Sequence, residues 1–133
     1  MLVVKASAKP SRIHGIGLFA DQDIKKGKLI WKFDPRFDIL FDPKEVDLMP
    51  KIQKDFIKHC AYLSKVTGKY ILSVDDSRFL NHSSNNNIDG IDIAGGPEGG
   101  DAANRDIRAG EELTVDYRTF DSNDESDGKD YLK

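Results

Sequence analysis

The sequence has little of what metal and disulfide chemistry requires. One cysteine among 133 residues excludes an internal disulfide and a cysteine-rich zinc site. The three histidines are too widely spaced to form a metal-ligand motif, so we expect no metal. No apolar run approaches the roughly 20 residues of a membrane-spanning helix, and residues 1–6 lack a signal peptide's long apolar region. These absences favour an intracellular protein, cytoplasmic or nuclear, without a membrane partner.

The net charge of -3 argues against a dedicated nucleic-acid binder, which usually carries a basic surface. The chain length fits one domain, and 32% charged residues are typical of a soluble globular protein. Because the composition becomes acidic near the end, we divide the chain into a domain at residues 1–120 and a tail at 121–133. The tail is either a solvated extension or a negative field that attracts a basic peptide.

Many short elements are expected before the tail. Pro50 starts the one main helix, predicted over residues 50–64, because apolar residues recur there at helical spacing: Ile52, Phe56, Cys60 and Leu63. Strands are predicted at residues 2–6, 70–74, 88–93 and 102–107. Two similar glycine turns are predicted at residues 24–30 and 107–113. The expected fold class is therefore mostly β.

Three polar or glycine-containing stretches are candidates for a site. The first is His-Gly-Ile-Gly-Leu-Phe-Ala at residues 14–20, which matches the dinucleotide pattern G-x-G-x-x-A. That pattern needs a helix opening at the glycines, and Asp21-Gln22-Asp23 and Gly27 follow too soon, so we reject a nicotinamide site. The second stretch is Arg-Phe-Leu-Asn-His-Ser at residues 78–83. The third is Gly-Glu-Glu-Leu-Thr-Val-Asp-Tyr at residues 110–117.

Two other interpretations of the second stretch fail. Residues 81–83 form a glycosylation sequon, but a chain without a secretion signal should not meet that machinery. His82 and Ser83, with Asp75 or Asp76, supply the residue types of a hydrolase triad. Adjacent His and Ser cannot readily form a nucleophile–base pair, however, and no G-x-S-x-G elbow is present.

Taken together, the three stretches resemble a SET domain, the β-clip fold of S-adenosylmethionine-dependent protein lysine methyltransferases. The likeness covers about residues 4–120, nearly the entire chain, and is closest to the small single-domain members. It implies several short sheets, one main helix, and a pseudoknot in which the segment carrying Asn81 and His82 passes under the loop that ends at Tyr117. The cysteine-rich zinc segment that follows many relatives is absent. Phe120, Tyr131 and Leu132, or a partner chain, are candidates to cover the site instead.

The resemblance also assigns roles. It implies that Tyr117 is the principal catalytic residue and that Asp116 helps to hold the pseudoknot. The residues implied to bind S-adenosylmethionine are Gly15, Ile16, Gly17, Arg78, Asn81, His82, Tyr117 and Phe120. Phe33 stands where many members have a tyrosine, so we assign the second catalytic hydroxyl to Tyr70, with Tyr62 as second choice. The lysine channel is then expected to contain Phe33, Tyr70, Val115 and Tyr117, and the small Val115 leaves room for more than one methyl group.

The chemistry implied by this family needs few charged groups. The methyl of a sulfonium is already electrophilic, so an aligned neutral amine displaces it directly and leaves S-adenosylhomocysteine. An apolar aromatic channel lowers the pKa of the incoming lysine, which favours the neutral amine. The expected partner is a protein with an exposed lysine, such as a basic histone or histone-like protein, and the chain itself is expected to be a monomer or homodimer. The alternative is a binding module that keeps the fold without turnover.

Overall fold

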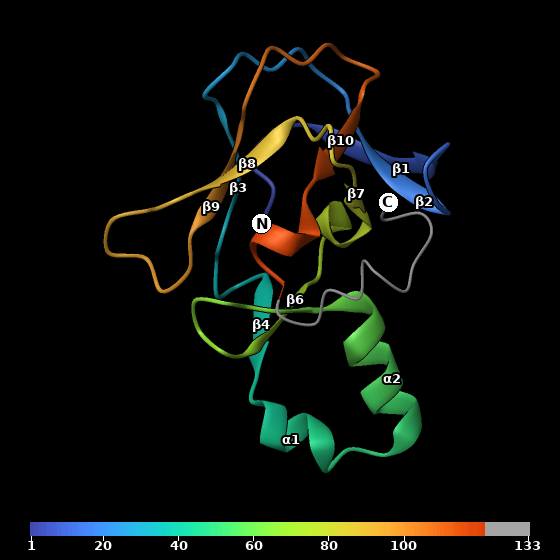
Figure 1. Cartoon of the computed structure of the whole chain (residues 1–133), viewed down its shortest axis with the longest axis vertical. Helices are drawn as coiled ribbons and strands as arrows, with labels where there is room; N and C mark the ends of the chain where they lie inside the picture. Colours follow the sequence, from blue (N-terminus) through green and yellow to red (C-terminus); the bar gives the residue numbers. More distant parts are fainter. Residues whose placement is uncertain (122–133) are drawn as a thin grey trace.

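Ten short strands and two α-helices make up residues 1–121, the part of the chain that the computed structural model describes (Figure 1). In chain order these are β1 (Ala6–Pro10), β2 (Ile16–Ala20), β3 (Leu29–Lys32), β4 (Asp38–Phe41), α1 (Pro43–Asp47), α2 (Lys51–Cys60), β5 (Tyr62–Leu63), β6 (Tyr70–Ser73), β7 (Asn81–His82), β8 (Ile88–Ile91), β9 (Gly100–Ala103) and β10 (Glu112–Val115). Short 3-10 helices, η1 (Asp76–Phe79) and η2 (Tyr117–Thr119), precede β7 and follow β10. Tyr131 and Leu132 lie outside the described residues.

The strands form three small sheets, which confirms the mostly β fold class. One sheet has the order β1-β2-β10-β7, and the others have the orders β3-β9-β8 and β4-β6-β5. Helices α1 and α2 lie together at one end of the molecule, beside the β4-β6-β5 sheet (Figure 1). The pairing of β7 with β10 is parallel, whereas the other strand pairs are antiparallel. Parallel neighbours need a long connection, and here it contains β8 and β9 of a different sheet.

The two glycine turns recognised in the sequence lie side by side. Gly27 and Gly110 have φ values of 87° and 95°, a region that glycine enters at little cost. The Ile24 and Ile107 amides each donate to the other residue's carbonyl, at 2.7 Å in both directions. Both isoleucine side chains are buried in the main core. The similar sequences therefore reflect two turns that pack together.

The helix prediction was correct in type but wrong in extent and in its buried face. Pro50 is the N-cap of α2, which ends at Cys60 because Ala61 is extended and leads into β5. Ile52 and Phe56 are 81% and 51% exposed, whereas Ile57 is buried. The apolar spacing thus identified a helix but not the face that packs on the core. Ile57, the residue that is buried, is not one of the apolar residues on which the prediction was based. Helix α1 was not predicted, although Pro43 and the Asp42 N-cap are ordinary helix-start signals.

Three strand predictions were shifted. The first strand is β1 at Ala6–Pro10 rather than residues 2–6, because antiparallel pairing with β2 begins at Ala6 and Leu2 forms only an isolated bridge with Trp31. The alternating segment at residues 88–93 pairs only as far as Ile91. The strand predicted at residues 102–107 is β9 at Gly100–Ala103, because its two neighbours pair with residues 100–103.

Buried apolar residues fall into three clusters. The main cluster lies beneath the four-stranded sheet and the β8–β9 region, and Leu80, Tyr117 and Phe120 pack on its edge. A second contains Trp31, Phe33 and Ile71, with Tyr62 packed against it, and a third joins α1 and α2 to Tyr70. Cys60 is half-buried in this region, and His59 is exposed as predicted.

Candidate active site

The parallel pair β7–β10 brings the second and third sequence stretches together. Asn81 lies opposite Thr114, and His82 lies opposite Val115. The Ser83 amide extends the pairing by donating to the Val115 carbonyl at 2.9 Å. The segment carrying Asn81 and His82 therefore runs directly beside the segment that leads to Tyr117, as the resemblance implied for the pseudoknot.

The Asn81 side chain connects the β7–β10 pair to the glycine turn before β2. Its amide nitrogen donates to the His14 carbonyl at 3.0 Å, to the Ile16 carbonyl at 3.4 Å and to Glu112 Oε2 at 3.0 Å. An amide nitrogen has two hydrogens, so these three acceptors share two donors. At least one acceptor can therefore take a further hydrogen from a bound amino group.

Glu112 closes this network from β10. The Ser11 hydroxyl donates to its carboxylate at 2.7 Å and 2.9 Å, and also accepts from the Ile13 amide. Gly17 allows the close approach, since a Cβ there would lie 2.5 Å from Glu112 Oε2. Gly15 has a φ of 46°, in the left-handed region. The turn is thus shaped by glycine and held by the Ser11–Glu112–Asn81 hydrogen bonds.

His82 fixes the backbone at Tyr117. The Tyr117 amide donates to His82 Nδ1 at 3.1 Å, so in this arrangement that nitrogen carries no proton. His82 Nε2 then carries the proton of the neutral ring. It is buried without a hydrogen-bond partner among residues 1–121. Asp116 Oδ1 lies 3.5 Å from Nδ1, and hydrogen bonding from Arg118 lowers the pKa of Asp116.

A series of contacting aromatic rings leads away from the β7–β10 pair. We call it the aromatic path, and it consists of His82, Tyr117, Phe120 and Tyr62. The Tyr117 ring lies 5.6 Å from the His82 ring and 5.9 Å from Phe120, and Phe120 lies 5.0 Å from Tyr62 in an edge-to-face contact. The Tyr117 hydroxyl donates to the Leu80 carbonyl. Burial, followed by the negative charges of Glu98 and Asp101, raises the pKa of the Tyr62 hydroxyl. Tyr62 therefore stays protonated near neutral pH.

The other predicted site residues are spread over different parts of the fold. Tyr70 is buried with Val46 and Ile57 in the third cluster, so the structure connects Tyr62, the second choice, to Tyr117 through Phe120. Val115 is buried in the main core, and Phe33 in the second cluster. Arg78 is exposed on η1 with its guanidinium 4.4 Å from the centre of the Phe79 ring. Roles for these four residues in a channel or cofactor site stay predictions.

Three contributors were missed or given no role by sequence reasoning: Ser11, Asn87 and Glu112. Glu112 stood inside a recognised stretch, but its contact with Ser11 joins residues 101 positions apart and has no local signal. The Asn87 side chain donates to the Glu112 carbonyl and accepts from the Thr114 amide, both at 2.9 Å. In sequence it belonged to an Asn-rich turn.

The residues at the glycine turn fit the methionine part of S-adenosylmethionine. The turn is exposed at Gly15 and Ile16, and acceptors for an amino group converge there. The unpartnered His82 Nε2 is a further donor beside Tyr117. In residues 1–121, no three or more His, Cys, Asp or Glu side chains are grouped to hold a metal ion. None of the helices in this part of the chain is long and apolar enough to cross a membrane.

Comparisons with known proteins agree with this geometry. The sequence model of the family described as SET domain matches residues 15–118, whereas no curated protein matches the chain. A Plasmodium falciparum structure, assigned as a histone methyltransferase, has a TM-score of 0.59 at 18% identity and covers 86% of this chain and 93% of its own. A humanised mutant of the Chaetomium thermophilum Polycomb Repressive Complex 2, bound to an inhibitor, has a TM-score of 0.65 at 23% identity. That match covers 90% of this chain but 16% of the other. At these identities the likeness shows the fold.

Proposed function

Because the chain belongs to the SET-domain family, we propose that it is a methyltransferase that uses S-adenosylmethionine to methylate lysine side chains of a protein. The parallel pairing of β7 with β10, which sets Tyr117 beside Leu80 and His82, is the observation that carries this proposal. When bound, S-adenosylmethionine supplies an electrophilic methyl group. The chain has to bind the donor, align the amine and exclude water.

Asn81 and the turn at Gly15–Gly17 are proposed to bind the amino acid part of the donor. The shared acceptors around the Asn81 amide suit an ammonium group, and the glycine backbone permits close approach. Ser11 and Glu112 hold this turn in its shape, so they position the binding groups.

Tyr117 is proposed to orient the lysine amine. Its hydroxyl proton points to the Leu80 carbonyl, which turns the oxygen lone pairs toward other donors. The His82 acceptor fixes the Tyr117 backbone from behind. Phe120 and Tyr62 extend an aromatic surface from this point, where an amine loses water and its pKa falls toward neutrality. Such positioning is worth several kcal/mol in rate.

A basic protein is the proposed substrate. The Plasmodium falciparum structure that this chain resembles is assigned as a histone methyltransferase, and a histone or histone-like protein offers many exposed lysines. This chain spans only 16% of the Polycomb chain that it matches.

Tyr117→Phe separates binding from turnover. We expect calorimetry to show S-adenosylmethionine affinity within about threefold of wild type, since the Asn81 network is untouched. Methyl transfer to a basic protein should fall at least about 100-fold, the usual effect of removing a positioned catalytic hydroxyl. Full activity of this variant, or no cofactor binding by the wild-type chain, would refute the proposal.

A further inference from the structure

A recess lies beside the aromatic path, between the β3–β4 connection and the β8–β9 loop. Its volume is about 470 Å³, and its apolar lining includes Phe33, Leu40, Ile93 and Pro97. Glu98 is the acidic residue of the wall, and Lys32 also lines the recess. The recess is large enough for one or two side chains of a bound peptide, which is the scale of a small ligand site.

Glu98 is fixed in its orientation by a buried partner. The Ser64 hydroxyl, 1% exposed as a residue, donates to Glu98 Oε2 at 2.6 Å. The same hydroxyl oxygen accepts from the Val66 and Thr67 amides at 3.0 Å and 3.2 Å. The β8–β9 loop is thereby tied to the β5–β6 turn, and the Glu98 carboxylate is held between them.

Asp101 supplies a second carboxylate behind Glu98. It lies on β9 directly opposite Trp31 of β3, so the two side chains share a face of the sheet. Trp31 is buried with Phe33 and Tyr62, and its indole Nε1 has no acceptor among residues 1–121. Within the same part of the chain, no hydrogen bond or ion pair satisfies the Asp101 carboxylate. Burial, followed by the charge of Glu98, raises the pKa of Asp101 to about 7.

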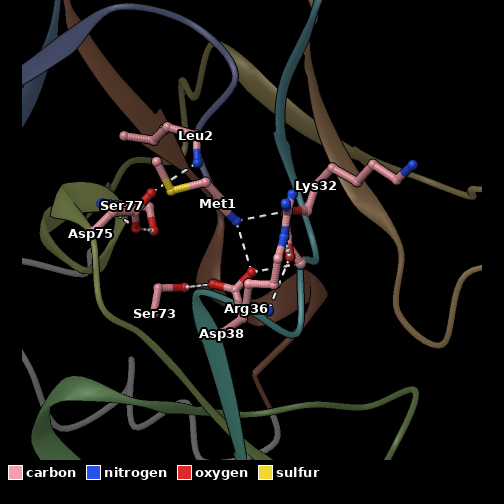
Figure 2. Close-up of polar contacts among 9 residues, drawn as sticks. Met1, Leu2, Lys32, Arg36, Asp38, Ser73, Asp75 and Ser77 are labelled. Atoms are coloured by element: carbon pink, nitrogen blue, oxygen red, sulfur yellow. Dashed lines mark hydrogen bonds and ion pairs between the residues drawn. The ribbon is translucent and has the colours of Figure 1, made fainter.

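The positive groups nearby do not balance these two carboxylates. The Met1 ammonium acts on Asp101, but it is bound to Asp38 at 2.8 Å and to the Lys32 carbonyl at 2.7 Å. Lys32 lines the recess together with Glu98, but among residues 1–121 it forms no ion pair with Glu98 or Asp101, and Figure 2 shows its side chain extending away from Met1 and Asp38. Tyr62, the other titratable group that faces the pair, is neutral near pH 7. The Glu98 and Asp101 side chains are both half-buried beside aromatic rings, and among residues 1–121 neither carboxylate forms an ion pair, so the two can accept a cation.

We propose that Glu98 and Asp101 form a subsite for a positively charged alkyl side chain of the protein substrate, whose apolar neighbour occupies the recess. This assignment rests on the proposed function, because it gives the subsite to the substrate of methyl transfer. The subsite selects basic sequences, and Trp31, which lies opposite Asp101 in the pairing of β3 with β9, reports its occupancy. Since Asp101 ionises near pH 7, cation binding strengthens as the pH rises through that value.

The single tryptophan gives a direct test, because its indole N–H yields one resonance in a ¹H–¹⁵N spectrum. We would titrate n-butylammonium chloride into the full chain at pH 6 and pH 8, with n-butanol as the neutral probe. We expect a saturable shift of the Trp31 resonance with n-butylammonium, at least about threefold weaker at pH 6. Glu98→Gln and Asp101→Asn should each weaken binding about 3–10-fold, the range of partly exposed charge pairs.

Asp92→Asn is the matched control, because it removes an exposed carboxylate from the same loop and should leave binding unchanged. An equal response to n-butanol, or binding that neither Glu98→Gln nor Asp101→Asn weakens, would overturn the subsite. If either Glu98→Gln or Asp101→Asn lacks the spectrum of a folded protein, the binding measured for the other variant decides whether the subsite exists. The titration contains no S-adenosylmethionine, so failure of cofactor binding would refute the proposed function while leaving this result standing.

Discussion

At the scale of single residues, the site depends on contacts that join distant parts of the chain. The family resemblance named Gly15, Gly17 and Asn81 as cofactor-binding residues, a role that stays a prediction. It gave no sign that Glu112 would lie against Gly17, since that contact exists only after β2 and β10 have paired. It also favoured Tyr70 over Tyr62, a choice that depends on which core cluster each tyrosine enters.

Gly17→Ala tests the glycine turn. The added methyl group would lie within 3 Å of the Glu112 carboxylate, which Ser11 and Asn81 hold in place. We expect S-adenosylmethionine affinity to fall about 10-fold or more by calorimetry, because the displaced carboxylate disturbs the shared acceptors. Gly90→Ala is the control, since its nearest contact would be an ordinary 3.9 Å. Equal affinities for the two variants would contradict the role given to Glu112.

At the scale of elements, β10 is the strand on which the site is assembled. It pairs with β2 through residues 112–113 and with β7 through residues 114–115. The Asn87 side chain satisfies the backbone of residues 112 and 114, in the way a neighbouring strand would. Helical spacing predicted α2 and alternation predicted β8, but neither pattern reports such a side-chain substitute for a strand. Short strands are specified by their neighbours, which is why three of them were predicted with shifted ends.

Asn87→Leu should therefore destabilise the protein. The change leaves the Glu112 carbonyl and the buried Thr114 amide without partners, which costs about 2–4 kcal/mol in the free energy of unfolding. Urea denaturation followed by circular dichroism measures this change in the free energy of unfolding. Asn85→Leu, at an exposed position in the same turn, should change stability by no more than about 0.5 kcal/mol. Similar losses at both positions would show that Asn87 does not support β10.

At the scale of the whole molecule, three small sheets place the residues proposed to bind the cofactor at one end of an aromatic path, with Glu98 and Asp101 at the other. The family resemblance predicted the fold class and the side-by-side arrangement of β7 and β10. The acidic pair was beyond sequence reasoning, because Glu98 lay in a glycine-rich loop and Asp101 in a short strand with no distinguishing pattern. The position of Asp101 opposite Trp31, and of both carboxylates near Tyr62, follows from how the sheets pack.

The burial of Asp101 predicts a pH dependence of stability. The pKa of Asp101 is about 7 in the folded protein against an ordinary 3.8, so the folded state binds a proton that the unfolded state has lost above about pH 4. Stability therefore falls as the pH rises from about 4 to 7 and stays reduced above that range. Asp101→Asn removes this loss, so its Tm should exceed that of wild type at pH 8, by roughly 3–8 °C for a gain of about 1 kcal/mol.

The thermal melts should be repeated at pH 5, where wild-type Asp101 is protonated and the difference should shrink. Asp92→Asn again serves as the control and should follow the wild-type curve at both pH values. Parallel curves for wild type and Asp101→Asn would mean that Asp101 is not held in its protonated form by burial.

The measurement that tests the proposed activity most directly is mass spectrometry of the reaction products. The purified chain would be incubated with S-adenosylmethionine and a mixture of basic histone proteins. We predict methyl groups on lysine side-chain nitrogens, with S-adenosylhomocysteine released in equal amount. Methyl groups found on another residue type, or bound S-adenosylmethionine left intact with every lysine unmodified, would contradict it.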